Sequence, residues 1–513
     1  MFVRRLAGLS VFCFVIANLA FMSVANAQVV GIAGTPGCIY NSLQDAIDDG
    51  EFNLTVTSNV GAASGADWAI TSMPNAHVRI TGVGSGCSGS GTPVLDMSTG
   101  VTRFQLVTVP PMGQLTLTNL EFNEGAGPFI TAQGGLPQSA QITLDRVAIE
   151  RTAGTVIDLR GGVVNLIDTT LRFGTENTPI VVRRGGRLEA LDSQIAFNVS
   201  GPNDGGGLRL LGGEANLADV GVAWNDADGH GGGIFVGGDA LGGSVLTVDA
   251  TSSVILNDAT GDGGGYYIQN AHYSCATGCL DTDVTLGGLV KYNQSNRGGG
   301  LAIHRNAKVT IDDADISINT GNSGAGIRVN GGEINISDSL VLNNRGVGFY
   351  TVQADVDARR LRIADNDSHG IDARGGSDFF LSNSAIYDND GDGVNVVSSN
   401  VDIEMATFVR NDRPIDYSGS TGDVVSTIMF SNGVTGRVHN GSTVLRDCVR
   451  ATDWSLGSSG TVTEINALPL VDPQFVDSAN QDFHLRSTSP MIDVCPNGSR
   501  PDLDGLSGTP ATL

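Results

Sequence analysis

Hydrophobic and polar residues alternate along short stretches of this chain, and most of these stretches end at an asparagine. Examples are IAFN at 195–198, VAWN at 222–225 and VILN at 254–257. Alternation with a period of two predicts β-strands that turn every second side chain inward. The asparagines at the strand ends are Asn198, Asn225, Asn257, Asn293, Asn319, Asn343 and Asn389. Because Asn tolerates left-handed backbone and stacked copies can share amide hydrogen bonds, we expect these residues to form the turns and a ladder.

A glycine-rich run that ends in one hydrophobic residue follows each asparagine, as in GGGL at 205–208 and GGGI at 231–234. This residue recurs every 22 or 23 positions between Ile327 and Val394, and inserted loops lengthen the earlier steps. The predicted column is Phe129, Val156, Ile180, Leu208, Ile234, Tyr266, Leu301, Ile327, Phe349, Ile371, Val394 and Ile415. A repeat of this length holds only two or three short strands, so it buries a core by stacking on its neighbours.

The repeat therefore predicts an all-β solenoid, a single-stranded parallel β-helix of about twelve coils. Propeller blades need longer repeats, and leucine-rich repeats need a leucine pattern that this chain lacks. We expect an N-terminal helical cap and the first coils at 28–110 and the β-helix at 111–435. A C-terminal β cap and tail would then occupy residues 436–513.

The two ends of a solenoid must protect an exposed core and free strand edges. NSLQDAIDDG at 41–50 predicts a short amphipathic helix over the first coil, with Leu43, Ala46 and Ile47 on one face. Ser42 is placed to cap this helix and Gly50 to end it. Sequence order favours three disulfides, Cys38–Cys87, Cys275–Cys279 and Cys448–Cys495, the last fastening the C-terminal cap.

Composition and charge point to an exported protein. Residues 1–27 have the basic start, the apolar centre and the small-residue cleavage pattern of a signal peptide, and no later stretch is apolar enough to span a membrane as a helix. The formal net charge is −25, and lysine occurs only at Lys291 and Lys308. Such a surface repels nucleic acid, suits an extracellular setting and could hold calcium.

The coil pattern resembles the right-handed parallel β-helix, the fold shared by pectate lyases. The turn followed by a GG-hydrophobic run at 197–208 and at 224–234 resembles the repeats of polymorphic outer-membrane protein passengers. The segment 472–494 is similar to the closing segment of many bacterial exported β-helix proteins. These resemblances imply the fold and an exported protein, whereas a fold of this kind hosts many functions.

NDADGHGGGI at 225–234 aligns without gaps with NDATGDGGGY at 257–266, so the residues before the glycines should stack. The stacked column is Asp204, His230, Asp262 and Arg297. Two acids, a histidine and an arginine in one column could serve acid–base chemistry on a polysaccharide. The alternative interpretation, without catalysis, is a solvated turn that needs small and polar residues. GHG at 229–231 also occurs in polygalacturonases, but the Asn-Thr-Asp motif of that family is absent.

DNDGDG at 388–393 is the candidate metal site. Asp388, Asp390 and Asp392, followed by Gly393, match the first half of a calcium loop because alternate carboxylates converge on a hard cation. The twelfth position is Ser399 instead of Glu, and the same residues also form an ordinary turn of the repeat.

Aromatic residues near the repeat turns could stack on sugar rings, or they could form inward-facing ring ladders in the core. They are Trp224, Tyr266, Tyr267 and Tyr292.

The leading hypothesis is an exported, elongated protein for adhesion or glycan binding at the bacterial surface or in the medium. The alternative is a polysaccharide lyase or glycoside hydrolase that acts on an extended acidic polysaccharide through the 204–297 column.

Overall fold

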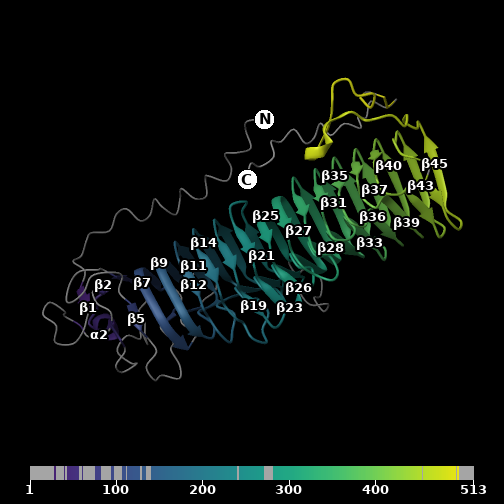
Figure 1. Cartoon of the computed structure of the whole chain (residues 1–513). Helices are drawn as coiled ribbons and strands as arrows, with labels where there is room; N and C mark the ends of the chain where they lie inside the picture. The colour runs from purple at the N-terminus through teal and green to yellow at the C-terminus, as the bar shows by residue number, and fades with distance from the viewer. Residues whose placement is uncertain are drawn as a thin grey trace.

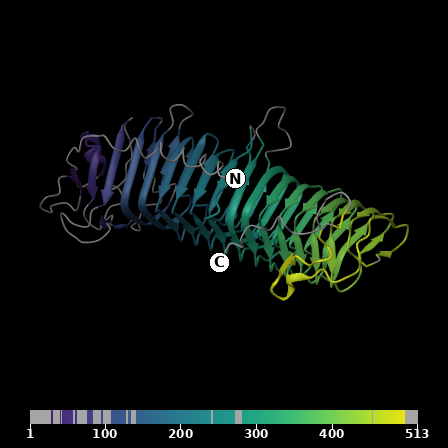
Figure 2. The same ribbon diagram turned by 90° about the horizontal axis from the view of Figure 1, so that it is seen from above.

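The computed structural model describes residues 140–239, 242–270, 281–452, 454–492 and 494–495. Upstream it describes 28–30, 40, 43–56, 60–61, 76–82, 94–96, 107–110, 112–126 and 130–133. Together these residues form one rod of stacked coils, with strands running across the rod axis (Figures 1 and 2).

Each coil contributes one strand to each of three parallel sheets. In one coil β13 (Ile180–Arg183), β14 (Gly186–Leu191) and β15 (Gln194–Ala196) follow one another. In the next coil β16 (Leu208–Leu211), β17 (Glu214–Ala218) and β18 (Gly221–Ala223) lie directly beside them, in parallel and in the same order. The parallel β-helix predicted from the repeat is therefore confirmed.

The first sheet also contains β6 (Val107–Val109), β8 (Ile130–Gln133), β10 (Ile157–Arg160), β20 (Ile234–Gly237), β24 (Tyr266–Gln269), β30 (Phe349–Val352), β33 (Ile371–Arg374), β36 (Asp392–Val397), β39 (Arg413–Ser418), β42 (Arg437–His439) and β44 (Ser455–Leu456). The second sheet also contains β1 (Gln28–Val30), β2 (Asn53–Val56), β4 (His77–Gly82), β11 (Gly162–Ile167), β21 (Val245–Val248), β31 (Asp355–Arg359), β34 (Asp378–Ser382), β37 (Asn400–Glu404), β40 (Thr421–Val425), β43 (Thr443–Asp447) and β45 (Thr461–Ile465).

The third sheet also contains β3 (Val60–Gly61), β5 (Val94–Asp96), β12 (Thr170–Arg172), β22 (Ser253–Ile255), β29 (Leu340–Leu342), β32 (Arg362–Ala364), β35 (Ala385–Tyr387), β38 (Thr407–Val409) and β41 (Ile428–Phe430). Five longer strands bend from one sheet into the next: β7 (Gln114–Ala126), β9 (Gln141–Ala153), β25 (Asp283–Lys291), β27 (Leu301–Ser317) and β28 (Ile327–Ser337). A small extra sheet joins β19 (Asp226–Ala227), β23 (Asp258–Asp262) and β26 (Gln294–Arg297).

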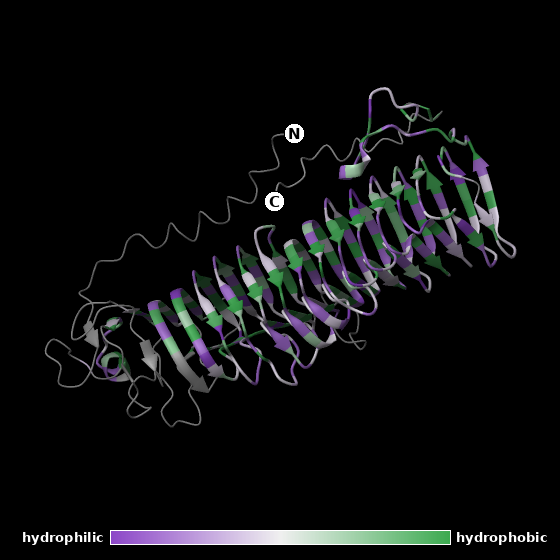
Figure 3. Ribbon diagram, in the orientation of Figure 1, coloured by the Kyte–Doolittle hydropathy of each residue, from purple (hydrophilic) through white to green (hydrophobic). Residues whose placement is uncertain are grey.

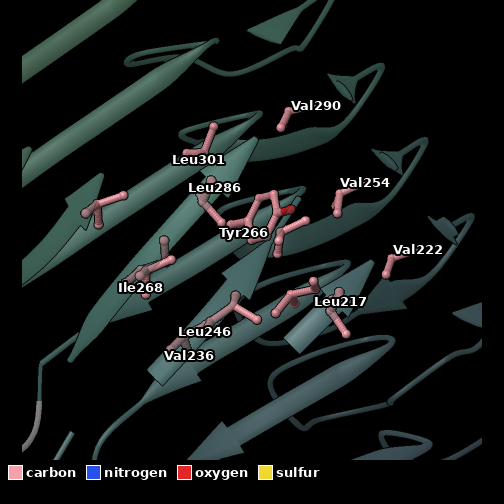
Figure 4. Packing of buried hydrophobic residues seen from close by; sticks show 14 of the residues in the cluster. Leu217, Val222, Val236, Leu246, Val254, Tyr266, Ile268, Leu286, Val290 and Leu301 are labelled. Atoms are coloured by element: carbon pink, nitrogen blue, oxygen red, sulfur yellow. The ribbon is translucent and has the colours of Figure 1, made fainter. Parts of the chain in front are cut away.

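The core is built from columns of inward-facing apolar side chains, each column taking one residue from every coil (Figure 4). A strand of the first sheet contributes to two columns, as Leu208 and Leu210 do in β16. Figure 3 shows the corresponding alternation of hydrophobic and hydrophilic residues along the strands. The predicted column from Ile180 to Ile415 pairs residue by residue between neighbouring coils. Upstream the column passes through Ile130 and Ile157, so the prediction of Val156 was one residue early. Phe129 lies outside the described residues.

A ladder of buried asparagine side chains runs along the turn after the third sheet. Each side chain donates a hydrogen bond to the side-chain oxygen of the next asparagine, as Asn225 does to Asn257 at 3.0 Å. The ladder members are Asn198, Asn225, Asn257, Asn293, Asn319, Asn344, Asn366, Asn389, Asn411 and Asn432. The ladder uses Asn344 and not the predicted Asn343, because Asn343 occupies the preceding position.

The left-handed backbone of this turn lies one residue before the ladder asparagine. Phe197, Trp224 and Asn343 have φ angles of 58°, 57° and 55°. The prediction that the asparagine itself makes the left-handed turn is therefore wrong for the ladder asparagines and holds only at Asn343. Its side chain is needed inside the rod, where it satisfies buried backbone groups of two coils.

The glycine runs are required by close packing between coils. A Cβ at Gly232 would lie 2.2 Å from the carbonyl oxygen of Asp258 and 2.6 Å from that of Gly264. No side chain fits there without moving the backbone, so the run that resembles an active-site loop is first of all a contact between coils.

The N-terminal helix forms where the sequence predicts it. Helix α2 (Leu43–Asp48) buries Leu43, Ala46 and Ile47 in the main core. Gly50 ends it with a φ of 86° and donates its backbone N–H to the carbonyl of Ile47 at 3.0 Å. Ser42 lies outside the described residues.

At the other end the coils continue past residue 435 through β42, β43, β44 and β45. The chain then turns back along the side of the rod, where β46 (Phe475–Asp477) and β47 (Asp482–Leu485) form an antiparallel pair around the 3-10 helix η2 (Ser478–Asn480) (Figure 1). The predicted disulfide Cys448–Cys495 is present, with a Cα separation of 5.7 Å. It ties the end of this tail to the last coils.

Several predictions concern residues that the structure does not describe. These are the signal peptide at 1–27 and the disulfides Cys38–Cys87 and Cys275–Cys279. Among the described residues, no helix has the length and apolar character needed to cross a lipid bilayer.

Candidate functional site

The predicted column beside the first sheet does come together in space. The backbone N–H of His230 donates to Asp204 Oδ1 at 2.9 Å, and the backbone N–H of Asp262 donates to His230 Nδ1 at 2.9 Å. Arg297 Nε donates to Asp262 Oδ1 at 2.8 Å. Each member of the column therefore binds the residue of the neighbouring coil. Because His230 Nδ1 accepts a hydrogen bond, its neutral ring carries the proton on Nε2.

Asp262 is the buried centre of this column. Its side chain is 4% exposed, and His304 Nε2 lies 3.6 Å from its second carboxylate oxygen. Burial lowers the pKa of His304 to about 4, so this imidazole is neutral at physiological pH although Asp262 opposes the shift. Tyr267 stacks between the rings of His230 and His304, with centroid distances of 4.4 and 5.0 Å.

The same arrangement occurs a second time, nearer the C-terminus. His369 Nδ1 accepts the backbone N–H of Asp392 at 3.0 Å, and Arg413 Nη1 lies 3.2 Å from Asp392 Oδ1. The sequence analysis missed this second His–Asp–Arg unit, although HGI, GDGV and RPI at 369–371, 391–394 and 413–415 carry it. Recurrence favours a structural role, since the unit neutralises a buried carboxylate and links three coils.

The carboxylates of DNDGDG point to different partners. Asp388 accepts two hydrogen bonds from Arg410 at 2.6 Å each. Asp390 is exposed, and Asp392 is buried beside His369 and Arg413. Among the described residues, no group of three His, Cys, Asp or Glu side chains is placed to hold a metal ion. Calcium binding at this segment stays a prediction from the sequence.

The four aromatic residues singled out in the sequence take three different positions. Tyr266 points into the core between the sheets (Figure 4). Tyr267 lies on the outer side of the first sheet within the histidine stack, 6% exposed. Trp224 and Tyr292 are 52% and 50% exposed and occupy the left-handed position before the ladder asparagine.

Two further aromatic residues, which the sequence analysis missed, occupy the same left-handed position. Phe173 stacks on Phe197 and Phe197 stacks on Trp224, with centroid distances of 5.3 and 5.9 Å. The sequence contains a signal for Phe197, since this residue directly precedes a ladder asparagine, as Trp224 does. Three successive coils thus expose a continuous stack of aromatic rings, which we call the aromatic column.

Phe197 and Trp224 of the aromatic column form one wall of a shallow groove on the outer face of the third sheet. The groove encloses about 520 Å³. Small side chains form its floor, and it is lined by Asp192, Ser193, Gln194, Ala196, Phe197, Asp219, Gly221, Ala223, Trp224, Ser253 and Ile255. We call it the aromatic groove.

The wall opposite the aromatic column carries stacked carboxylates at the turn from the second to the third sheet. The pKa of Asp192 is raised because its side chain shares a hydrogen bond with Asp219, and the charges of Asp219 and Asp168 add to the effect. The groove is therefore anionic on one side and aromatic on the other.

Comparison with protein-family models supports the fold. Residues 294–449 match the family model described as "Right handed beta helix region". Among solved structures, the A-module of the mannuronan C-5 epimerase of Azotobacter vinelandii is 12% identical to this chain, covering 83% of this chain and 92% of that one with a TM-score of 0.27. No curated protein matches the chain. The fold is a right-handed parallel β-helix, as the sequence pattern and its resemblance predicted.

Proposed function

We propose that this protein is an exported glycan-binding protein whose binding site is the aromatic groove. The observation that carries the proposal is the row of exposed rings at the left-handed position. Left-handed backbone is costly for bulky side chains and cheapest for Gly, Asn and Asp. Phe173, Phe197 and Trp224 nevertheless occupy it, and they are 38%, 44% and 52% exposed. Leu256 and Ile318 occupy the equivalent position in later coils, so the backbone conformation alone does not call for a ligand. The support for a ligand is that three aromatic rings in successive coils are both exposed and stacked in one row.

The two walls of the groove suit the two sides of a sugar. The apolar C–H face of a pyranose ring packs on an aromatic ring, and its hydroxyl groups donate hydrogen bonds to carboxylates. Asp192 and Asp219 supply such acceptors opposite Phe197 and Trp224. Because these acids repel anions, the expected ligand is a neutral or amino-sugar glycan chain. A straight rod with rings in successive coils also favours an extended polymer.

Cleavage of an acidic polysaccharide through the 204–297 column is the alternative. In the described structure these side chains are held within the column: Asp204 accepts a hydrogen bond from the backbone N–H of His230, and Asp262 is paired with Arg297. A general acid and base must instead be directed at the substrate. The geometry therefore favours binding over cleavage, and export remains part of the proposal, based on residues 1–27.

The test is calorimetric titration of the mature chain with neutral, amino-sugar and uronic-acid oligosaccharides. We expect a neutral or amino-sugar oligomer to bind and Trp224→Ala to weaken it about tenfold or more, since buried aromatic contacts are worth on the order of 1–2 kcal/mol. Phe380→Ala, which removes a half-exposed ring from the second sheet, is the matched control and should bind normally. Absence of binding by the folded wild type, or equal affinity of Trp224→Ala, would refute the proposal.

A further inference from the structure

The floor of the aromatic groove contains a glycine that the fold does not require. Gly221 lies in β18, where it pairs in regular register with Gln194 on one side and Ser253 on the other. Its φ angle lies outside the left-handed range that favours glycine. A Cβ at this position would meet nothing closer than the hydroxyl oxygen of Ser253, at 3.8 Å, which is an ordinary van der Waals distance. Neither backbone strain nor packing between coils therefore calls for a glycine here.

Other strand glycines of the rod differ from Gly221 in this respect. A Cβ at Gly422 in β40 would lie 2.0 Å from the carbonyl oxygen of Val401. Glycine inside a strand weakens it, because it offers no side chain to pack and loses more backbone entropy on folding. Where neither a bulge nor close packing explains such a glycine, the close approach of a ligand is a common reason. Gly221 lines the open groove, so the space above it is available to a ligand.

Two neighbouring coils supply the small residues of this floor beside the ring wall. They are Ala196 and Ala223, which pair with each other, and the coils on either side place Arg172 and Ile255 in the same row. Larger side chains therefore bound the floor at both ends. Neighbouring strands lie about 4.8 Å apart, so this opening accommodates roughly one or two sugar rings.

The acid wall of the groove favours a cationic group on the ligand. The carboxyl of Asp192 shares a hydrogen bond with that of Asp219, and the negative charge of Asp168 acts on it as well. At the same turn of a later coil Asp338 differs, because Arg360 pairs with it at 2.6 Å. Like charges stacked on successive coils repel one another, and a cation placed beside them removes this cost.

We infer that the aromatic groove is a subsite for an amino sugar with a free amine, seated over Gly221. This inference rests on the proposed glycan binding and specifies its ligand. The sugar ring packs its C–H face on Phe197 and Trp224. Its ammonium group donates hydrogen bonds to Asp192 and Asp219. A neutral or N-acetylated sugar lacks this charge, and a uronic acid is repelled by the same carboxylates.

The first experiment is calorimetric titration of the full mature chain with three oligomers of equal length and linkage, made of glucosamine, N-acetylglucosamine or glucose. They differ only in one substituent of each ring, which is an ammonium, an acetamido or a hydroxyl group. The titrations are run at slightly acidic pH, where the amines are protonated, and with EDTA, so that no divalent cation supplies the charge. We expect the glucosamine oligomer to bind about tenfold or more tightly than the other two, as for a hydrogen bond to a charged group. Asp219→Asn should remove this preference.

Gly221→Val separates a ligand role of this glycine from a structural one. Valine fills the space above the strand and favours strand conformation, so binding should weaken while the melting temperature stays equal or rises. We expect affinity for the glucosamine oligomer to fall about tenfold or more. A glycine that the fold needs would give the opposite result, a lower melting temperature.

Two further variants control for folding and for bulk. Gly221→Ala adds one methyl group at an ordinary contact distance, so it should keep the fold and weaken binding less than Gly221→Val does. Thr247→Ile enlarges an exposed residue of β21 on the second sheet and should bind like the wild type.

The inference fails if the glucosamine oligomer is not the tightest ligand, if Gly221→Val keeps wild-type affinity, or if Gly221→Val loses stability together with binding. If Trp224→Ala still weakens binding in these cases, glycan binding by the groove stands and only the choice of ligand falls. Absence of binding of all three oligomers to the folded wild type would refute the proposed function and this inference together.

Discussion

The third sheet has a bare outer face from β12 to β22 and a covered one from β32 to β41. The bare part carries the aromatic groove. The covered part lies under the C-terminal tail, where Phe475 and Phe483 pack against Tyr387 and Phe430. Both parts share the same three-residue strands and the same asparagine ladder. The backbone therefore does not decide which surface is presented.

The difference lies in the residues that point outward. In the bare part the strands present small residues such as Ala196 and Ala223, and the left-handed position carries rings in three coils and Leu256 in the fourth. In the covered part the strands present Tyr387 and Val409, which the tail buries, and the left-handed position carries Asp365, Asp388 and Arg410. Rings at the turn with a small-residue floor make a groove, whereas large outward residues make a surface for the protein's own tail.

Phe483→Ala is the substitution expected to have the largest effect on this comparison. The ring lies 4.9 Å from Tyr387 and 5.4 Å from Phe475, between centroids, and is 4% exposed. Its removal should cost about 3–4 kcal/mol of tail docking. Limited proteolysis should then cut the tail, and the free energy of unfolding measured in denaturant should fall. Phe197→Ala on the bare part should change stability by less than about 1 kcal/mol. Equal losses for the two variants would contradict the comparison.

The ladder should be equally important in both parts. Asn225 and Asn389 are 1% and 2% exposed, and each donates to a backbone carbonyl and to the next asparagine while accepting from the previous one. Asn225→Ala and Asn389→Ala should each lose about 2–3 kcal/mol of unfolding free energy, because buried backbone groups lose their partners. A difference between the two larger than about 1 kcal/mol, measured by urea denaturation, would show that the ladder is not uniform.

A smaller effect is expected at the left-handed position of the covered part. Arg410 donates two hydrogen bonds to Asp388 at 2.6 Å each and one to the carbonyl of Ser478 at 3.0 Å. The pair is partly exposed, so Arg410→Ala should cost about 1 kcal/mol and loosen the tail. Trp224→Ala, at the equivalent position of the bare part, should leave thermal unfolding nearly unchanged and reduce glycan binding. A loss of stability in Trp224→Ala together with unchanged stability in Arg410→Ala would contradict the assignment of Arg410 to tail docking and Trp224 to glycan binding.

The smallest expected effect is a pH dependence from the turn between the second and third sheets of the bare part. The hydrogen bond with Asp219 raises the pKa of Asp192, so the folded protein holds this proton more tightly than the unfolded chain does. The resulting stabilisation is complete below the ordinary aspartate pKa and is lost as pH rises through the raised value. Asp192→Asn should remove this part of the decline in melting temperature as the pH rises above the ordinary aspartate range, about pH 4. The covered part has Arg360, Asn383 and Met405 at the same turn and no such pair.

The aromatic residues show how far sequence reasoning reached. Alternation and the glycine repeat predicted the strands and the column from Ile180 onward, and the order of the cysteines predicted the disulfide Cys448–Cys495. They did not distinguish Asn343 from Asn344, because both follow the same alternating stretch. Of the aromatic residues chosen, Tyr266 is in the core and Trp224 is on the surface, which depends on the register of single residues within the coil.

The candidate column shows the corresponding limit for chemistry. The gapless alignment of 225–234 with 257–266 correctly stacked Asp226 on Asp258 and brought His230 next to Asp262. The column also placed Arg297 beside Asp262, but it could not reveal that His304 reaches the same carboxylate from β27 or that Tyr267 stacks on both histidines. These contacts join residues of different coils and strands, so no local pattern contains them.

The periodic spacing of apolar residues, asparagines and glycines determined that this chain winds into a β-helix, because a repeat too short to bury its own core has to stack on its neighbours. Tertiary structure alone decided which outward faces remain open. The tail returns to one part of the third sheet and leaves the aromatic column of the other exposed. The physical reason is that exposure depends on which surfaces fit together across long separations in sequence, whereas the period is set residue by residue along the chain.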